Sequence, residues 1–165
     1  ENTSDGIIAP LFFYQVGGLP VAFLYRFTNT ADAMLGYHDA VHEWLGKIPA
    51  RLDDLFNLFP ARLTAGLTVF AAALQSFNWR KSLLVWQRDA ACTASPNAGH
   101  PMSAAAGALQ VQLEKVGHYR LGKGLPPPRS ADIGKAVRLM RTVTALAGIG
   151  CLGLGLLAWK HRRRP

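Results

Sequence analysis

Two adjacent carboxylates stand in the most acidic short stretch of the chain, ARLDDLFNLFPARL at residues 50–63. If this stretch is helical, Asp53 and Asn57 share one face at i, i+4 spacing, and Asp54 lies on the next face. Mg²⁺ takes a few oxygen ligands from a protein and completes its shell with water and substrate phosphates. The spacing is therefore compatible with Asp53 and Asp54 as ligands of Mg²⁺. The alternative is a salt-bridged helix at a membrane surface.

Arg51 and Arg62 flank these carboxylates within the same stretch. A guanidinium group can donate two parallel hydrogen bonds to a phosphate. We therefore expect both arginines to bind phosphate oxygens.

A second polar motif, SPNAGHPMSAAAGAL at residues 95–109, joins a turn to a helix with hardly any side chains. The turn holds Ser95, Asn97 and Gly99. One interpretation is a tightly packed structural corner. The other is a mouth in which backbone N–H groups and a helix N-terminus receive an anion. The motif alone leaves both open.

A third motif, NTADAMLGY at residues 29–37, is typical of the start of a helix. Asn29 or Thr30 can cap the N-terminus, and Asp32 in the first turn complements the helix dipole. Capping is a complete structural explanation of these residues.

The composition indicates that these motifs belong to a membrane protein. Of 165 residues, 50% are hydrophobic and only 17% are charged, yet the net charge is +8. A nucleic-acid binder would show a dense basic and aromatic face, which is absent here, so we exclude that class. The cysteines, Cys92 and Cys151, form no disulfide or metal framework, and the histidines have no metal-ligand spacing.

Three apolar regions must position the motifs. The clearest, at residues 142–159, is uncharged, long enough to span a bilayer and bounded by basic residues. The first, at about 7–27, is interrupted by prolines and a glycine pair, so we expect a broken helix. The second, LTAGLTVFAAAL at residues 63–74, is short for a span unless its helix starts earlier, which would give a region of about 55–74.

The predicted fold is all-α: one membrane-embedded domain over residues 1–165, polytopic, with proline-broken helices and a long polar insertion. Residues 75–141 hold ten Lys or Arg against three Asp or Glu, and residues 122–130 are typical of an irregular loop. The orientation in the membrane stays open. A site built from both residues 50–63 and 95–99 requires one face, so we expect the second apolar region to return to the side it left.

Four blocks, in order, resemble the CobD/CbiB family, the membrane-embedded adenosylcobinamide-phosphate synthases of cobalamin biosynthesis. The resemblance extends from Glu1 to about Tyr119, and family members are roughly twice this length. It implies a multi-pass protein of the cell membrane, and we expect this chain to correspond to the C-terminal half. The blocks are ENTSDGIIAPLFF (1–13), NTADAMLGY (29–37), ARLDDLFNLFPARLTA (50–65) and SPNAGHPMSAAAGAL (95–109).

The resemblance implies an ATP-driven amide ligation. An aminopropanol-type amine, or its phosphate ester, is joined to the free carboxylate of adenosylcobyric acid. We therefore expect Mg²⁺ and ATP as cosubstrate, and a corrinoid, a small amine and the membrane as partners, with an N-terminal half or separate subunit also needed. The expected roles are metal binding or acid–base catalysis for Asp32, Asp53 and Asp54, and phosphate or substrate binding for Asn29, Arg51, Arg62, Ser95, Asn97 and Gly99.

Three positions depart from the family pattern. Val41-His42 stand where relatives usually have Arg-Tyr, residues 91–93 lack a basic residue or histidine, and His100 replaces a tryptophan. The missing cationic groups are of the kind that bind phosphate. The alternative function is therefore a non-catalytic membrane subunit that keeps the fold.

Overall fold

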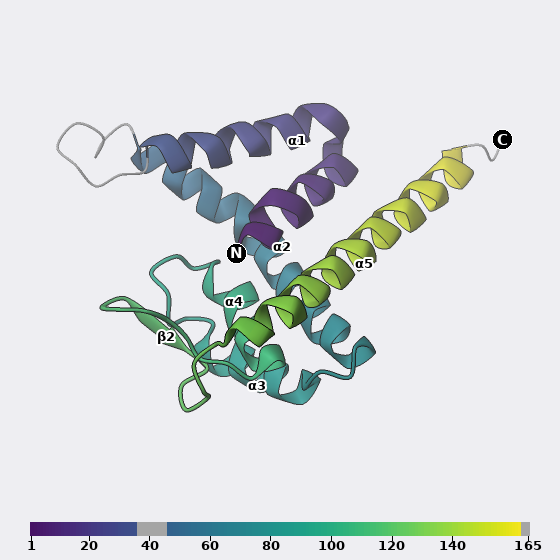
Figure 1. Ribbon diagram of the computed structural model, residues 1–165. Helices are drawn as coiled ribbons and strands as arrows, with labels where there is room; N and C mark the ends of the chain where they lie inside the picture. The colour runs from purple at the N-terminus through teal and green to yellow at the C-terminus, as the bar shows by residue number, and fades with distance from the viewer. Residues whose placement is uncertain (36–45, 163–165) are drawn as a thin grey trace.

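The computed structural model describes residues 1–35 and 46–162, and these are mostly helical (Figure 1). This confirms the all-α prediction; the described residues contain strands only in one short antiparallel hairpin. The Val41-His42 pair and the end of the 29–37 block lie outside the described residues. In chain order the elements are η1, a π-helical turn (Ser4–Ile8), α1 (Ala9–Leu35), α2 (Lys47–Leu74), α3 (Trp79–Asp89), α4 (Gly99–Leu109), β1 (Leu113–Lys115), β2 (Tyr119–Leu121) and α5 (Ser130–Arg162).

The first apolar region is a helical hairpin. Residues 17–18 are non-helical, and Gly18 has φ 68° and ψ −159°, a conformation essentially restricted to glycine. The limbs then fold against each other (Figure 1). The Tyr25 hydroxyl lies 3.2 Å from the Asp5 carbonyl oxygen, and the rings of Phe13 and Tyr25 are 4.9 Å apart. A straight helix would separate residues 5 and 25 by about 30 Å. The predicted break is confirmed.

The second apolar region is one continuous helix, α2, which begins at Lys47 rather than near residue 55. Pro60 is accommodated inside it, and the Thr64 hydroxyl donates to the Pro60 carbonyl oxygen at 2.7 Å. The acidic stretch therefore lies within α2. The fold-back expected for this region occurs instead in the first one.

The polar insertion at residues 75–129 holds α3, α4 and the hairpin, followed by the predicted irregular loop. α3 and α4 pack at backbone distance. A Cβ at Gly107 would lie 2.4 Å from the Lys81 carbonyl oxygen, and the Ser82 hydroxyl donates to the Ala104 carbonyl oxygen at 2.7 Å. Small residues in α4 are therefore a requirement of this packing.

The third apolar region forms the C-terminal half of α5, which begins at Ser130. The Gln75 side chain, just after α2, contacts the Arg138 carbonyl oxygen at 3.0 Å and the Thr142 hydroxyl. Beyond these contacts α5 extends away from α2 (Figure 1). Three helices of the described chain are long and apolar enough to cross a membrane: Ser4–Leu35, Lys47–Leu74 and Ser130–Leu157.

The main core lies where η1, α2, α4 and α5 meet. Three of its six buried residues are alanines, which let the helix axes approach closely. The core therefore holds the insertion against α2 and α5. Its buried members are Ile8, Ala71, Ala72, Ala108, Leu139 and Val143.

Candidate functional site

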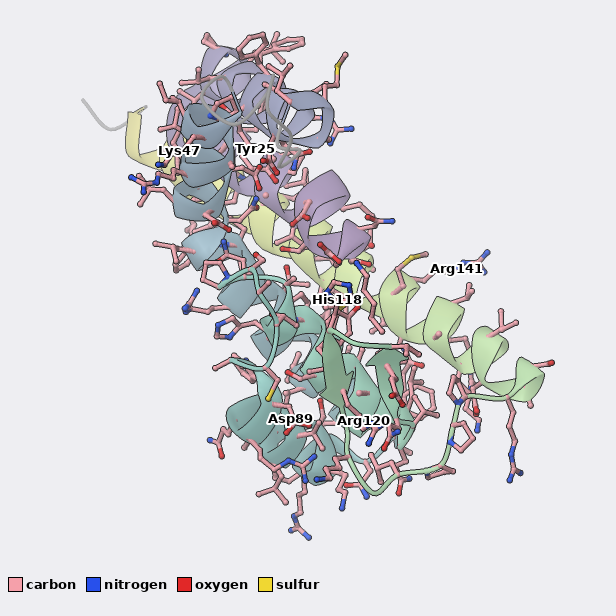
Figure 2. The ribbon with its side chains drawn as sticks, turned by 90° about the vertical axis from the view of Figure 1, so that its left-hand side faces the viewer. Tyr25, Lys47, Asp89, His118, Arg120 and Arg141 are labelled. Carbon is pink, nitrogen blue, oxygen red and sulfur yellow. The ribbon has the colours of Figure 1, made fainter. Side chains whose placement is uncertain are left out.

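A polar cavity of about 670 Å³ lies between η1, the second limb of α1, the N-terminal half of α2 and the loop before α4. Because these elements come from distant parts of the sequence, the cavity brings together residues that are far apart in the chain. In Figure 2, Tyr25 lies near the upper end of the molecule and Asp89 near the lower end. The predicted residues that line the cavity are Asn29, Asp32, Asp53, Asp54, Ser95 and Asn97.

Asp53 is oriented by two amide side chains. Its Oδ1 accepts from Asn29 Nδ2 at 3.1 Å, and its Oδ2 accepts from Asn57 Nδ2 at 2.9 Å. Asn57 is itself held by the Tyr25 hydroxyl, which donates to Asn57 Oδ1 at 2.9 Å. The i, i+4 spacing of Asp53 and Asn57 is thus confirmed as a contact. The network fixes the carboxylate and ties α1 to α2.

Asp54 instead faces the loop before α4. Ser95 Oγ donates to Asp54 Oδ1 at 3.2 Å, and Asn97 Nδ2 donates to the Asp54 carbonyl oxygen at 2.7 Å. The Ser95 hydroxyl also accepts from the Asn97 backbone N–H at 3.2 Å. The 50–63 and 95–109 blocks therefore lie in direct contact.

Asn97 leaves one polar atom without a partner. The residue is 5% exposed, and its Oδ1 is buried with no hydrogen bond. The amide orientation is fixed, because Nδ2 faces two acceptors of Asp54. A buried acceptor without a donor costs about 1–3 kcal/mol, so it calls for an explanation.

The cavity is strongly acidic. Its one arginine, Arg26, donates to Asn29 Oδ1 at 3.1 Å rather than to a carboxylate. The salt bridges within residues 1–35 and 46–162 all lie elsewhere. Such a site favours a cationic ligand, or an anion that arrives with a cation. The aspartates that line it are Asp5, Asp32, Asp53 and Asp54.

The described residues contain no group of three His, Cys, Asp or Glu side chains placed to hold a metal ion. Asp53 faces α1 and Asp54 faces the 95–97 loop, so the two predicted ligands are held against different walls. A divalent cation here would depend on oxygens of a ligand. This dependence is the usual mode of Mg²⁺ at phosphate sites.

Three predicted residues lie outside the cavity lining. Arg51 is exposed, Arg62 donates to the Leu58 carbonyl oxygen at 2.7 Å on the surface, and Gly99 is buried. The positions of the arginines follow from helix geometry, because residues 51 and 62 lie roughly opposite Asp53 around α2. Neither arginine lines this cavity, and their binding of phosphate stays a prediction.

Asn29 and Asp32 are not at a helix start. α1 continues through both, so the predicted N-cap is wrong, and Asn29 makes a tertiary contact with Asp53 instead. The local sequence resembled a cap because Asn and Asp are common in caps. The contact with α2 carries no local signal.

Among the charged residues that line the cavity, Glu1, Asp5 and Arg26 were not singled out from the sequence as site candidates. Asp5 lies in the polar ENTSDG block, and Arg26 is a charge at the end of an apolar region. Charges at membrane depth are costly and typically functional, which is the signal that could have identified Arg26.

The two interpretations of the 95–109 motif apply to different parts of it. A Cβ at Gly99 would lie 2.0 Å from the Ala90 carbonyl oxygen, so α4 and its first residue form a close-packed corner. Residues 95–97 face the cavity. The small side chains of α4 therefore bring the polar turn to Asp54.

His100 lies behind this corner. Its Nδ1 accepts from Trp86 Nε1 at 2.9 Å, which joins α3 to α4. Burial, with Arg62 nearby, holds the pKa of His100 below its ordinary value. A neutral imidazole is the form that can accept this hydrogen bond.

The family model described as CobD/Cbib protein matches residues 1–140. This chain belongs to the CobD/CbiB family. It is 48% identical to a probable cobalamin biosynthesis protein CobD of Methanothermobacter thermautotrophicus, over 92% of this chain and 52% of the relative. It is 45% identical to the cobalamin biosynthesis protein CobD of Geobacter metallireducens, over 96% of this chain and 50% of the relative.

A third relative, from Clostridium perfringens, is 41% identical over 93% of this chain and 50% of its own length. The chain thus spans about half the length of these curated relatives. No solved structure matches it. Family membership links the chain to cobalamin biosynthesis, and three helices of the described residues are long and apolar enough to cross a membrane.

Proposed function

We propose that this chain carries part of the site of an ATP-driven amide ligase, which joins an aminopropanol-type amine to the free carboxylate of adenosylcobyric acid. The observation that carries the proposal is the convergence of the four separate sequence blocks on one acidic cavity. Polar side chains gathered from distant segments, in a protein otherwise so apolar, are typical of a functional site.

The reaction requires the carboxylate oxygen to become a leaving group. A substrate carboxylate oxygen bonds to the γ-phosphorus of ATP as the bond to ADP breaks. The amine nitrogen then bonds to the acyl carbon, and inorganic phosphate leaves. The ammonium form must lose one proton before attack and a second as the amide forms. One of these protons is released overall and the other leaves on phosphate at neutral pH.

Asp53 is the residue best placed to hold Mg²⁺ on the phosphates. Both of its oxygens are oriented by amide donors, yet each keeps a further lone pair. When bound, Mg²⁺ would neutralise charge on the transferred phosphoryl group. Arg26 on the same wall can donate to phosphate oxygens, and Asp32 lines the cavity as a candidate base.

We also propose that the chain lies in the cell membrane with α5 crossing the bilayer and α1 entering and leaving on one face. The contact between Tyr25 and Asp5 supports the hairpin, because both limbs then start beside the same cavity. α5 contributes no residue to the lining of this cavity and is exposed and apolar over its C-terminal half.

The test is the conversion of adenosylcobyric acid to the amide by membranes that contain this chain combined with the part of the Geobacter metallireducens relative that it does not match. Asp53→Asn should lower turnover by roughly 10²–10³-fold, because it removes charge that stabilises the transition state. The matched control is Asp132→Asn at the start of α5, where asparagine can still accept from the Arg129 N–H.

If the Asp53→Asn variant turns over at nearly the rate of the Asp132→Asn control, Asp53 has a structural role and not a catalytic one. Absence of product from the unmodified protein, at normal expression in membranes, would favour the non-catalytic subunit. Product amounts are measured by chromatography and mass spectrometry at matched protein levels.

A further inference from the structure

One corner of the cavity pairs an unneutralised carboxylate with an unpaired amide oxygen. Asn97 Nδ2 donates to the Asp54 carbonyl oxygen, so the two residues are joined, and Asn97 Oδ1 is left buried without a donor. Within the described residues, the Asp54 carboxylate accepts from Ser95 Oγ and, at 3.4 Å, from Asn97 Nδ2, and from no other side chain. Both residues line the cavity.

We infer that Asp54 and Asn97 bind the protonated amino group of the small amine substrate. This assignment rests on the proposed ligation and goes beyond it, since it separates the amine from the phosphates within the cavity. A primary ammonium carries one positive charge and three N–H donors. The charge is complementary to Asp54, and one donor satisfies Asn97 Oδ1.

An ammonium fits this corner better than a divalent metal does. A primary ammonium needs one negative charge and a few acceptors, which Asp54 and Asn97 Oδ1 supply, whereas Mg²⁺ at this corner would have to complete an octahedral shell with oxygens from water and the ligand. The hydroxyl of Ser95 and the amide of Asn97 also direct hydrogen atoms toward Asp54. An ammonium tolerates such shared acceptors because its donors rotate freely.

The division of the cavity also suits the chemistry. Asp53 and Arg26 lie on the α1 side, and Asp54 lies against the 95–97 loop. An amine held on the loop side can approach an acyl carbon whose phosphate is bound on the other side. The two adjacent aspartates then serve different substrates.

The experiment is equilibrium dialysis of labelled 1-amino-2-propanol against the detergent-solubilised chain, without ATP, Mg²⁺ or corrinoid. Asp54→Asn keeps the shape and the backbone carbonyl that Asn97 contacts, and should weaken binding about tenfold to a hundredfold. Asp132→Asn should bind as the unmodified chain does. The N,N,N-trimethyl analogue, which has the charge but no N–H donor, and propane-1,2-diol, which has no charge, should compete poorly.

Several results would overturn the assignment. The first is unchanged binding of 1-amino-2-propanol by an Asp54→Asn variant whose circular-dichroism spectrum is normal. The second, which needs no variant, is competition by the trimethyl analogue as strong as that by unlabelled 1-amino-2-propanol. Displacement of the amine by millimolar MgCl₂, with loss of Mg²⁺ binding in Asp54→Asn, would make the corner a metal site. The dialysis requires no turnover. Amine binding here, together with no product in the ligation assay, would refute the proposed function but not the binding of the amine by Asp54 and Asn97.

Discussion

Two of the three long helices, α1 and α5, contain several glycines, yet they fold in opposite ways. α1 bends back at Gly17-Gly18, whereas α5 remains one helix although it carries four glycines in its C-terminal half. In α1 the pair is followed by Pro20, which removes a backbone donor, and Tyr25 then holds the second limb against η1. Glycine alone therefore does not break a helix; lost hydrogen bonds and a tertiary contact are also needed.

This difference separates two tasks. The bend in α1 brings Asp5, in η1 just before the first limb, and Asn29, in the second limb, to one polar cavity. α5 instead lines a smaller apolar pocket of about 320 Å³ against α2 and α4, with Val137 and Met140 among its walls. We conclude that α1 shapes the site and that α5 anchors it.

The strongest test of the comparison is the side of the membrane at which each helix ends. In a background of Cys92→Ser and Cys151→Ala, Asn2→Cys and Thr30→Cys should react with an impermeant maleimide from the same face. Ser130→Cys and Lys160→Cys, which lie near the two ends of α5, should react from opposite faces. Labelling of Asn2→Cys and Thr30→Cys from opposite faces would show that α1 crosses the bilayer.

A smaller effect, on the free energy of unfolding, is expected from replacing one glycine in each helix by alanine. Gly18→Ala places a side chain at φ 68°, ψ −159° and should lower the free energy of unfolding by about 1–3 kcal/mol. Gly153→Ala in α5 meets nothing within 4 Å and should change it by no more than about 1 kcal/mol, toward greater stability. Thermal unfolding in detergent compares the two, and equal effects would contradict the proposed origin of the bend.

The smallest effect concerns Asp89, outside both helices. Asp89 Oδ2 accepts from the Gly122 N–H at 2.6 Å, and Arg88 donates to both carboxylate oxygens. These contacts, that of Arg88 above all, hold the pKa of Asp89 below its usual range. The native state then binds fewer protons than the unfolded state near pH 4, so the stability from Asp89 is complete above the unfolded pKa of about 3.9 and is lost as pH falls through the lower native value.

Hydrogen exchange over residues 119–124, corrected for intrinsic rates, should therefore show a loss of protection below pH 4. Asp89→Asn should weaken protection at neutral pH by about 1–2 kcal/mol, discounted for the half-exposed Arg88, and should remove the acid-dependent step. If the loss of protection below pH 4 persists in Asp89→Asn, a titratable group other than Asp89 causes it.

The sequence by itself determined the helical class, the break in the first apolar region and the helical face shared by Asp53 and Asn57. Each depends on local patterns: apolar run length, a glycine pair with proline, and helical periodicity. The four sequence blocks were likewise enough to indicate the family, which the comparisons confirm.

Only the tertiary structure decided which polar residues meet. Asn29 looks like a helix cap in the sequence, but it lies inside α1 and contacts Asp53. Arg51 and Arg62 look like neighbours of the carboxylates, but neither lines the cavity, and both lie roughly opposite Asp53 around α2. Local sequence fixes the direction of a side chain only relative to its own helix. The partner of that side chain depends on how α1 bends and how the close packing of α4 on α3 sets the 95–97 loop against α2, and both depend on contacts between distant segments.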